Sequence, residues 1–234
     1  MTIASTLARV GRSLSASAGT IVFGMEDGTV SIFGLVFGVA ATTSSSIAVI
    51  VAGATGAAAA AVSMMAGAYL DAETSGDALL AAQERLKTDL TLDRDAIAAM
   101  LPGRLGTAGL PAPLCIALTN AVQNDRDALK GLLIALQASP EEHPNPWEQA
   151  LWMLTADFFS ASIPILPFIL LPIAEARIVS AVITILLLVA LGIGRARIGR
   201  RKVVRTVIET VAMGVAAAFA GVAIGMLIGG GVGG

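Results

Sequence analysis

The sequence predicts an all-α membrane protein with five transmembrane helices and a cytoplasmic helical insertion between the second and the third. Hydrophobic residues make up 56% of its 234 residues and only 14% are charged, whereas about a quarter of a soluble domain is charged. The mean hydropathy is +0.81, and the apolar residues gather in blocks long enough for spans of about 20 residues. The acidic residues gather elsewhere, because 12 of the 17 lie between Asp71 and Glu148.

The first apolar block, residues 21–70, carries only two charged residues, Glu26 and Asp27. It is too long for one membrane span and has the length of a helical hairpin. Five consecutive hydroxyl residues, Thr42–Ser46, are its most polar point and the preferred position for the turn, with Gly53–Gly56 as the alternative. The preferred turn gives two spans, at about 21–42 and 47–70.

Residues 71–147 are predicted to form the cytoplasmic helical insertion, since their apolar residues recur at helical spacing opposite a charged face. The second span is expected to continue into water as a helix until Pro102 and Gly103 stop it. The segment LCIALTNAVQNDRDALKGLLIALQ, residues 114–137, is predicted to be one further amphipathic helix. An insertion of this size is expected to pack on itself or on a second copy.

The third apolar region, residues 148–234, has the composition of three more spans. Proline at positions 164, 167 and 172 is expected to kink or break the first of these, because each proline removes a backbone donor. Such breaks persist in membranes where protein or a cavity covers the freed backbone groups. The three spans are expected at about 149–172, 174–193 and 204–228.

Basic residues predict the orientation in the membrane. Arg9 and Arg12 in the N-terminal segment, residues 1–20, place that segment in the cytoplasm. Five crossings then put the insertion and the six cations between Arg195 and Arg205 on the same side, with the C-terminus outside. No secretory signal is expected, and the alanine- and arginine-rich composition favours a bacterial inner membrane.

Asp27 and Met64 are the first candidates for metal ligands. They lie 16 and 19 residues from the predicted turn, which places both roughly 25 Å from the outer end of their helices at 1.5 Å per residue. A carboxylate opposite a thioether suits Fe²⁺ or a similar ion better than Ca²⁺ or Mg²⁺. Two alternatives stay open: Met64 as a packing residue, and Glu26 with Asp27 as residues at the inner membrane surface.

Two further acids, Asp157 and Glu209, lie near the inner ends of the third and fifth spans. Each either borders a transport route or faces solvent, and solvent is the simpler interpretation for Glu209. One cysteine and one histidine exclude cysteine-rich and multi-histidine metal centres. The sequence has no phosphate-binding GxxxxGK[ST] motif, so transport would be driven by a gradient and needs no permanently bound cofactor.

Three stretches together resemble the vacuolar iron transporter family. They are FGMEDGTVSIFGLVFGVA in the first span, SMMAGAYLD in the second and SIPILP in the third. The residues that match the family pattern are Gly24, Asp27, Gly28, Ser31 and Gly38, then Ser63, Met64, Gly67 and Tyr69, then Ile163, Pro164 and Pro167.

The resemblance implies a secondary transporter rather than an enzyme. It implies a homodimer in the lipid bilayer that carries Fe²⁺, and in relatives Mn²⁺, out of the cytosol in exchange for protons, without any nucleic-acid partner. It also implies that Asp27 and Met64 are ligands in the transport path. The alternative is a non-transporting membrane scaffold or metal sensor of the same fold.

One departure from the family pattern lies in the second span, where Ala68 stands in place of a glutamate. We hypothesise that Glu26 and Asp71 restore the missing negative charge from nearby positions, so the predicted metal site comprises Asp27, Met64, Glu26 and Asp71. The second half of the insertion also lacks a glutamate that the family often carries there.

Overall fold

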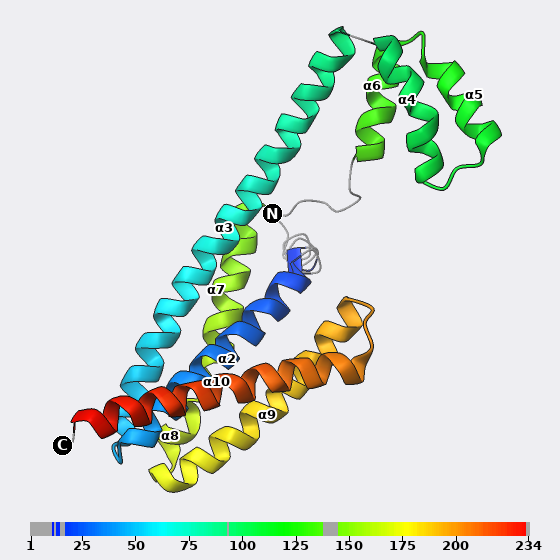
Figure 1. The fold of residues 1–234 in the computed structure, drawn as a ribbon. Helices are drawn as coiled ribbons and strands as arrows, with labels where there is room; N and C mark the ends of the chain where they lie inside the picture. Colours follow the sequence, from blue (N-terminus) through cyan, green and yellow to red (C-terminus); the bar gives the residue numbers. More distant parts are fainter. Residues whose placement is uncertain (1–10, 12, 15–16, 93, 138–144, 233–234) are drawn as a thin grey trace, which may run out of the picture. The chain divides into compact units, whose positions relative to one another are not determined.

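The computed structural model describes residues 11, 13–14, 17–92, 94–137 and 145–232. In this part of the chain every regular element is a helix, which confirms the all-α class (Figure 1). Four of these helices, against the five predicted spans, are long and apolar enough to cross a membrane. The helices are α2 (Ala18–Thr42), α3 (Ser46–Leu92), α4 (Arg94–Thr107), α5 (Ala112–Val122), α6 (Arg126–Gln137), α7 (Pro146–Ser162), α8 (Leu166–Leu170), α9 (Ile173–Ile198) and α10 (Val203–Val232).

The chain divides into two compact units, each with its own apolar core. The first unit comprises residues 1–72 and 143–234, and the second comprises residues 73–142. Helix α3 therefore contributes residues to both units.

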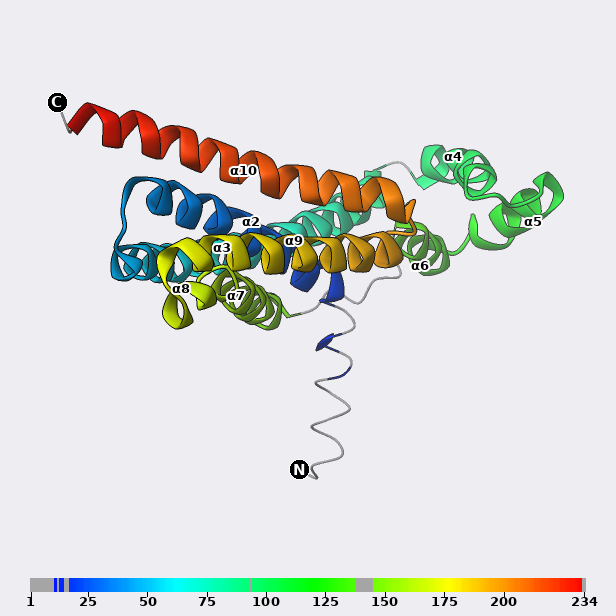
Figure 2. The ribbon, with the colours of Figure 1, turned by 90° about the horizontal axis from the view of Figure 1, so that it is seen from below.

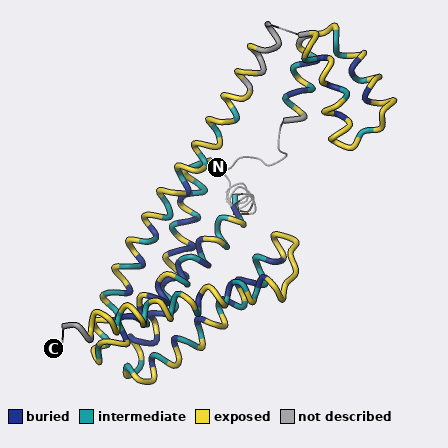
Figure 3. Tube along the Cα trace, viewed as in Figure 1, coloured by how far each residue is buried: buried dark blue, intermediate teal, exposed yellow. Residues whose placement is uncertain are grey.

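Helix α2 is the central helix of the first unit. It packs against α7, α9 and α10, and Figure 2 shows α9 and α10 running beside it. Half of its apolar stretch is buried, compared with 6% for α10, and the dark blue segments of Figure 3 show this difference. The core of the unit combines Ile32, Val36 and Ala40 of α2 with Val49, Ala57, Ala161, Ile165, Phe168 and Ala176.

The predicted turn of the first hairpin is confirmed, because α2 ends at Thr42 and α3 begins at Ser46. Within the turn, the amide of Ser45 donates to Thr43 Oγ1 at 3.1 Å. From α9, Arg177 Nη2 donates to the backbone oxygens of Ala40 and Thr43. The two bonds from Arg177 satisfy carbonyl groups that the end of a helix leaves without partners.

The break predicted at the prolines is also present. Helix α7 ends at Ser162, and a turn leads to the short α8, which begins at Leu166. Within the turn, the amides of Ile163 and Ile165 donate to the carbonyl oxygens three residues back, those of Ser160 and Ser162. Ser180 Oγ of α9 donates to the carbonyl oxygen of Pro164 at 2.7 Å, so a neighbouring helix covers part of the interrupted backbone. Because the break divides the predicted third span into two short helices, that span is not among the four long apolar helices.

The second unit corrects two sequence predictions. The helix that continues the second span ends earlier than predicted, at Leu92, and Pro102 and Gly103 lie inside a separate helix, α4. Leu101 and Leu105 are fully buried on either side of the proline, and their burial compensates for the lost backbone donor.

The second correction concerns residues 114–137, which form two helices, α5 and α6, instead of one. The chain turns at Gln123–Asp125, where Asp125 Oδ1 accepts from the backbone amides of Asp127 and Ala128, both at 3.0 Å. A carboxylate in this position caps the start of a new helix and therefore competes with continuation of the previous one.

Glycines bring α2 and α10 into backbone contact. A Cβ atom at Gly34 would lie 2.8 Å from the carbonyl oxygen of Ala217, and one at Gly38 would lie 2.7 Å from that of Gly221. Both distances are shorter than a carbon–oxygen contact allows, so only glycine fits at these positions. Small residues of this kind let membrane helices approach closely, because lipid provides no hydrophobic force between helices.

We expect Gly38→Val to separate α2 from α10 and to lower the free energy of unfolding by about 1–3 kcal/mol, the usual effect of overpacking. Thermal unfolding of the detergent-purified chain measures the change. Gly67→Ala is the matched control, because nothing lies within 4 Å of a Cβ placed there. Equal stability of the two variants would contradict the backbone contact.

Candidate functional site

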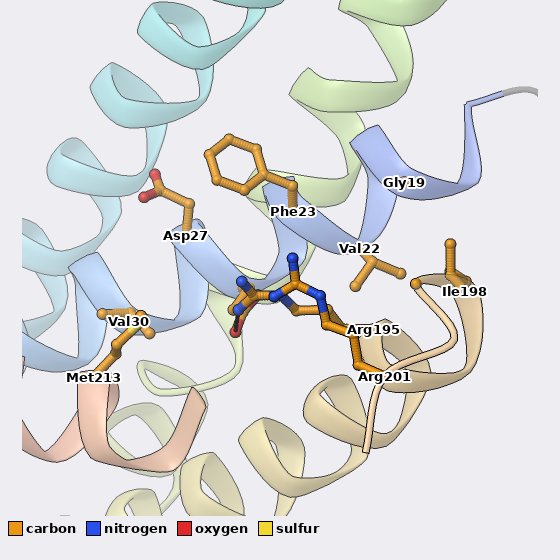
Figure 4. A pocket seen from close by; sticks show the side chains of 11 residues that line it. Gly19, Val22, Phe23, Asp27, Val30, Arg195, Ile198, Arg201 and Met213 are labelled. Carbon is orange, nitrogen blue, oxygen red and sulfur yellow. Dashed lines mark hydrogen bonds and ion pairs between the residues drawn. The ribbon is translucent and has the colours of Figure 1, made fainter. Parts of the chain in front are cut away.

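A cavity of about 380 Å³ lies between α2, the end of α9, the α9–α10 connection and Met213 of α10 (Figure 4). Two carboxylates from α2, Glu26 and Asp27, and two arginines, Arg195 and Arg201, form its polar wall. Its remaining lining is glycine and apolar side chains: Gly19, Val22, Phe23, Val30, Ile198, Gly199 and Met213. The cavity thus contains both acidic and basic side chains, and apolar residues line the rest of it.

Asp27 is half-buried and lies on a face of α2 that is open in the single chain. Phe23, Ser31 and Leu35, which share this face at a spacing of four residues, are exposed. In Figure 4 the carboxylate of Asp27 points away from Arg195 and Arg201. Within the described part of the chain, no hydrogen-bond donor or cation pairs with it.

Glu26 has a different environment, although it is the neighbouring residue. Its side chain is only 7% exposed, and Arg195 Nη1 of α9 donates to its two oxygens at 3.0 and 3.2 Å. Thr210 Oγ1 of α10 donates to Glu26 Oε1. Glu26 therefore links three helices, and its negative charge is already compensated within the chain.

The structure does not bring all four predicted ligands into the cavity. Met64 is half-buried on α3 and Asp71 is exposed on the same helix, and neither lines the cavity that contains Glu26 and Asp27. Among the described residues, no group of three or more His, Cys, Asp or Glu side chains has the arrangement of a metal site. One chain thus presents separate candidate ligands and no complete coordination sphere.

The two other membrane acids also differ from each other. Glu209 forms an ion pair with Arg205 at 2.9 Å, with side-chain exposures of 37% and 81%, which agrees with the solvent-facing interpretation. Asp157 is fully buried on α7, so the solvent-facing alternative is wrong for this residue. Neither of its carboxylate oxygens has a hydrogen-bond partner in the described part of the chain.

The arginines of the cavity are functional candidates that the sequence reasoning missed. Arg195 and Arg201 were counted only as cations of a linker between two spans. In the structure α9 continues to Ile198, so Arg195 lies in the last turn of that helix and reaches Glu26. The nearest signal in the sequence is two adjacent acids in one span and a cation near the end of another, and this does not specify which residues pair.

Comparison with known proteins identifies relatives over most of the chain. A sequence profile of the VIT family matches residues 18–226. A curated relative, "Vacuolar iron transporter" from Centaurea cyanus, is 29% identical over 179 residues, which cover 75% of this chain and 73% of the relative. The profile match includes α2 and α3, with all four predicted ligands.

We expect Arg195→Met to lower the free energy of unfolding by about 1–3 kcal/mol, because it leaves a buried carboxylate with one donor fewer. Pairing it with Glu26→Gln should recover part of this loss. The matched control is Arg205→Met, which removes an exposed pair of helix neighbours and should cost about 0.3–0.5 kcal/mol. Thermal unfolding of the three variants tests this ranking, and an equal loss in Arg195→Met and Arg205→Met would contradict it.

Proposed function

The chain belongs to the VIT family, and we propose that it exports a divalent metal ion, Fe²⁺ in preference to Mn²⁺, from the cytosol in exchange for protons. The observation that carries this proposal is Asp27, a half-buried carboxylate in an apolar membrane helix, with which no cation or hydrogen-bond donor among the described residues pairs. A charged group is costly in that position and usually serves the movement of ions. The name of the plant relative, an iron transporter, agrees with a metal ion as the cargo.

We propose that the working unit is a homodimer in which two copies of the open face of α2 meet. One chain offers an oxygen ligand at Asp27 and a sulfur ligand at Met64, which is too few for a first-row metal ion. In a twofold-symmetric dimer, the second copy supplies the same two ligands again, and the same surface of each copy forms the contact. The second copy would also shield Asp27 from lipid and cover the exposed Phe23 and Leu35.

The ligand types favour Fe²⁺ over harder ions. The thioether of Met64 is a soft ligand, which favours later and softer metal ions, whereas Mn²⁺ and Mg²⁺ favour oxygen. Glu26 is the weaker of the two carboxylate candidates in α2, because Arg195 and Thr210 already bind it. Asp71, exposed on α3, is a candidate for an early encounter with the metal rather than for tight binding.

Exchange with protons follows from competition between the metal ion and protons for the carboxylates of the membrane helices. A metal ion from the cytosol binds ionised Asp27, and protonation from the outer side promotes its release outward. The sequence has no nucleotide-binding motif, so a secondary transporter driven by the proton gradient is the simplest mechanism.

The proposed orientation rests on the positive-inside rule. The cations of the α9–α10 connection, together with residues 73–142, would lie in the cytoplasm, and the C-terminus would lie outside if α7 and α8 together make the third of five crossings. Arg9 and Arg12 lie outside the described residues. The plant relative lends no support to the predicted bacterial inner membrane.

We expect Asp27→Asn to abolish metal-dependent proton movement in proteoliposomes that contain the full chain. Amide substitution keeps the shape of the side chain but removes the charge that binds the metal. A fluorescent pH indicator and a metal indicator inside the vesicles record the two fluxes with Fe²⁺ and with Mn²⁺.

The matched control for this experiment is Glu209→Gln, which removes a membrane-helix carboxylate that is already paired at the surface. It should keep both fluxes. A wild-type chain that moves neither metal would refute export and favour the scaffold or sensor.

A second prediction concerns the sulfur ligand. Met64→Leu preserves apolar volume and removes the thioether, so Fe²⁺ transport should fall severalfold while Mn²⁺ transport falls less. Met65→Leu is the control, since Met65 is the next residue of α3 and is also half-buried. Competition between the two metals in the same vesicles measures the preference, and an identical response of both variants would remove Met64 from the metal path.

A further inference from the structure

Asp157 is the most unusual ionisable residue of the first unit. It lies on α7, its relative exposure is 0%, and both carboxylate oxygens lack a hydrogen-bond partner within the described part of the chain. The nearby Ser160 hydroxyl donates at 3.0 Å to the backbone oxygen of Asp157, not to its carboxylate. The proposed function does not yet use this residue.

The contact of Asp157 with α2 is very close. A Cβ atom at Gly28 would lie 2.8 Å from Asp157 Oδ1 and 2.9 Å from Ser160 Oγ, so α7 touches α2 at the residue that follows Asp27. This contact leaves no room even for a methyl group. A metal ion with its other ligands would not fit between these atoms, whereas a proton on the carboxylate needs no additional space.

The surrounding charges also favour a neutral Asp157. Helix α7 packs against α2, whose only ionisable residues are Glu26 and Asp27, both acids. The other acid of α7, Glu148, lies in its first turn and accepts from Ser13 Oγ at 2.9 Å. Arg195 of α9, a cation that lies against α2, is already bound to Glu26. An ionised Asp157 would therefore be a buried charge without compensation, which proteins avoid by keeping the group protonated.

We propose that Asp157 carries the proton that is exchanged for the metal ion. In the metal-free arrangement it is a neutral carboxylic acid. When the metal ion binds at Asp27, on the neighbouring turn of α2, its positive charge favours the ionised form of Asp157. Asp157 then releases its proton to the cytosol. When the metal ion leaves outward, Asp157 takes up a proton from the outer side, so each chain moves one proton inward per cycle.

This inference rests on the proposed metal–proton exchange. The test below distinguishes a failure of the role assigned to Asp157 from a failure of the exchange itself. The full chain is reconstituted as wild type and as Asp157→Asn, and metal and proton fluxes are recorded with Mn²⁺, which stays divalent in air. The amide imitates the neutral acid but cannot release a proton. We expect Asp157→Asn to move Mn²⁺ down its gradient with loss of the coupled proton flux.

Thr184→Val is the matched control, because Thr184 of α9 is also fully buried with an unpartnered side-chain oxygen. It should retain both fluxes, which distinguishes proton transport from a general effect of changing a buried polar group. Proton flux that remains coupled in Asp157→Asn overturns the assignment while leaving metal–proton exchange intact. Loss of Mn²⁺ binding together with the proton flux also overturns it, since that result marks a metal ligand.

An infrared difference measurement tests the assignment without a transport assay. The carbonyl stretch of a protonated carboxylic acid should be present in the metal-free wild type, should disappear when Mn²⁺ is added, and should be missing from Asp157→Asn. If that variant does not fold, the wild-type difference spectrum decides, and no loss of a protonated-acid band on Mn²⁺ addition overturns the assignment. A wild type that moves Mn²⁺ without protons refutes the proposed exchange itself.

Discussion

Close backbone contact along α2 is the constraint on which the first unit depends. Gly24 and Gly28 approach α7, while Gly34 and Gly38 approach α10. Because side chains are missing at these contacts, the neighbouring helices pack against the α2 backbone itself. Two faces of α2 are thereby covered, and the remaining face carries Asp27 between exposed apolar residues. Packing thus decides which carboxylate of α2 stays available to a ligand.

Three acids in this part of the molecule have three different environments. Glu26 is buried and compensated by Arg195 and Thr210, so it behaves as a link between helices. Asp27 is half-buried and has no cation or hydrogen-bond donor paired with it among the described residues, which suits the proposed binding of a passing cation. Asp157 is buried without a hydrogen-bond partner in the same part of the chain and is suited to the proposed role of holding a proton. The local environment of each carboxylate, more than its residue type, distinguishes the structural role of Glu26 from the roles proposed for Asp27 and Asp157.

Much of the fold follows from local sequence signals. The hydroxyl run at 42–46 ends a helix, and the prolines after Ser162 interrupt another, because both act through the backbone of their own segment. Pro102 was misjudged for the opposite reason: buried leucines on both sides hold α4 together, and their burial depends on the packing of the second unit.

The candidate site was only partly predictable. The family motif identified Asp27 and Met64, but neighbouring residues on a helix point about 100° apart, so the different roles of Glu26 and Asp27 depend on which helices pack against each side. The burial of Asp157 likewise depends on a glycine in another helix. The measurement that tests the central assignment most directly is anomalous diffraction from crystals of the full chain soaked with Mn²⁺. A metal peak beside Asp27, where two copies of α2 face each other, is the predicted result, and a peak at Glu26 with none at Asp27 would contradict it.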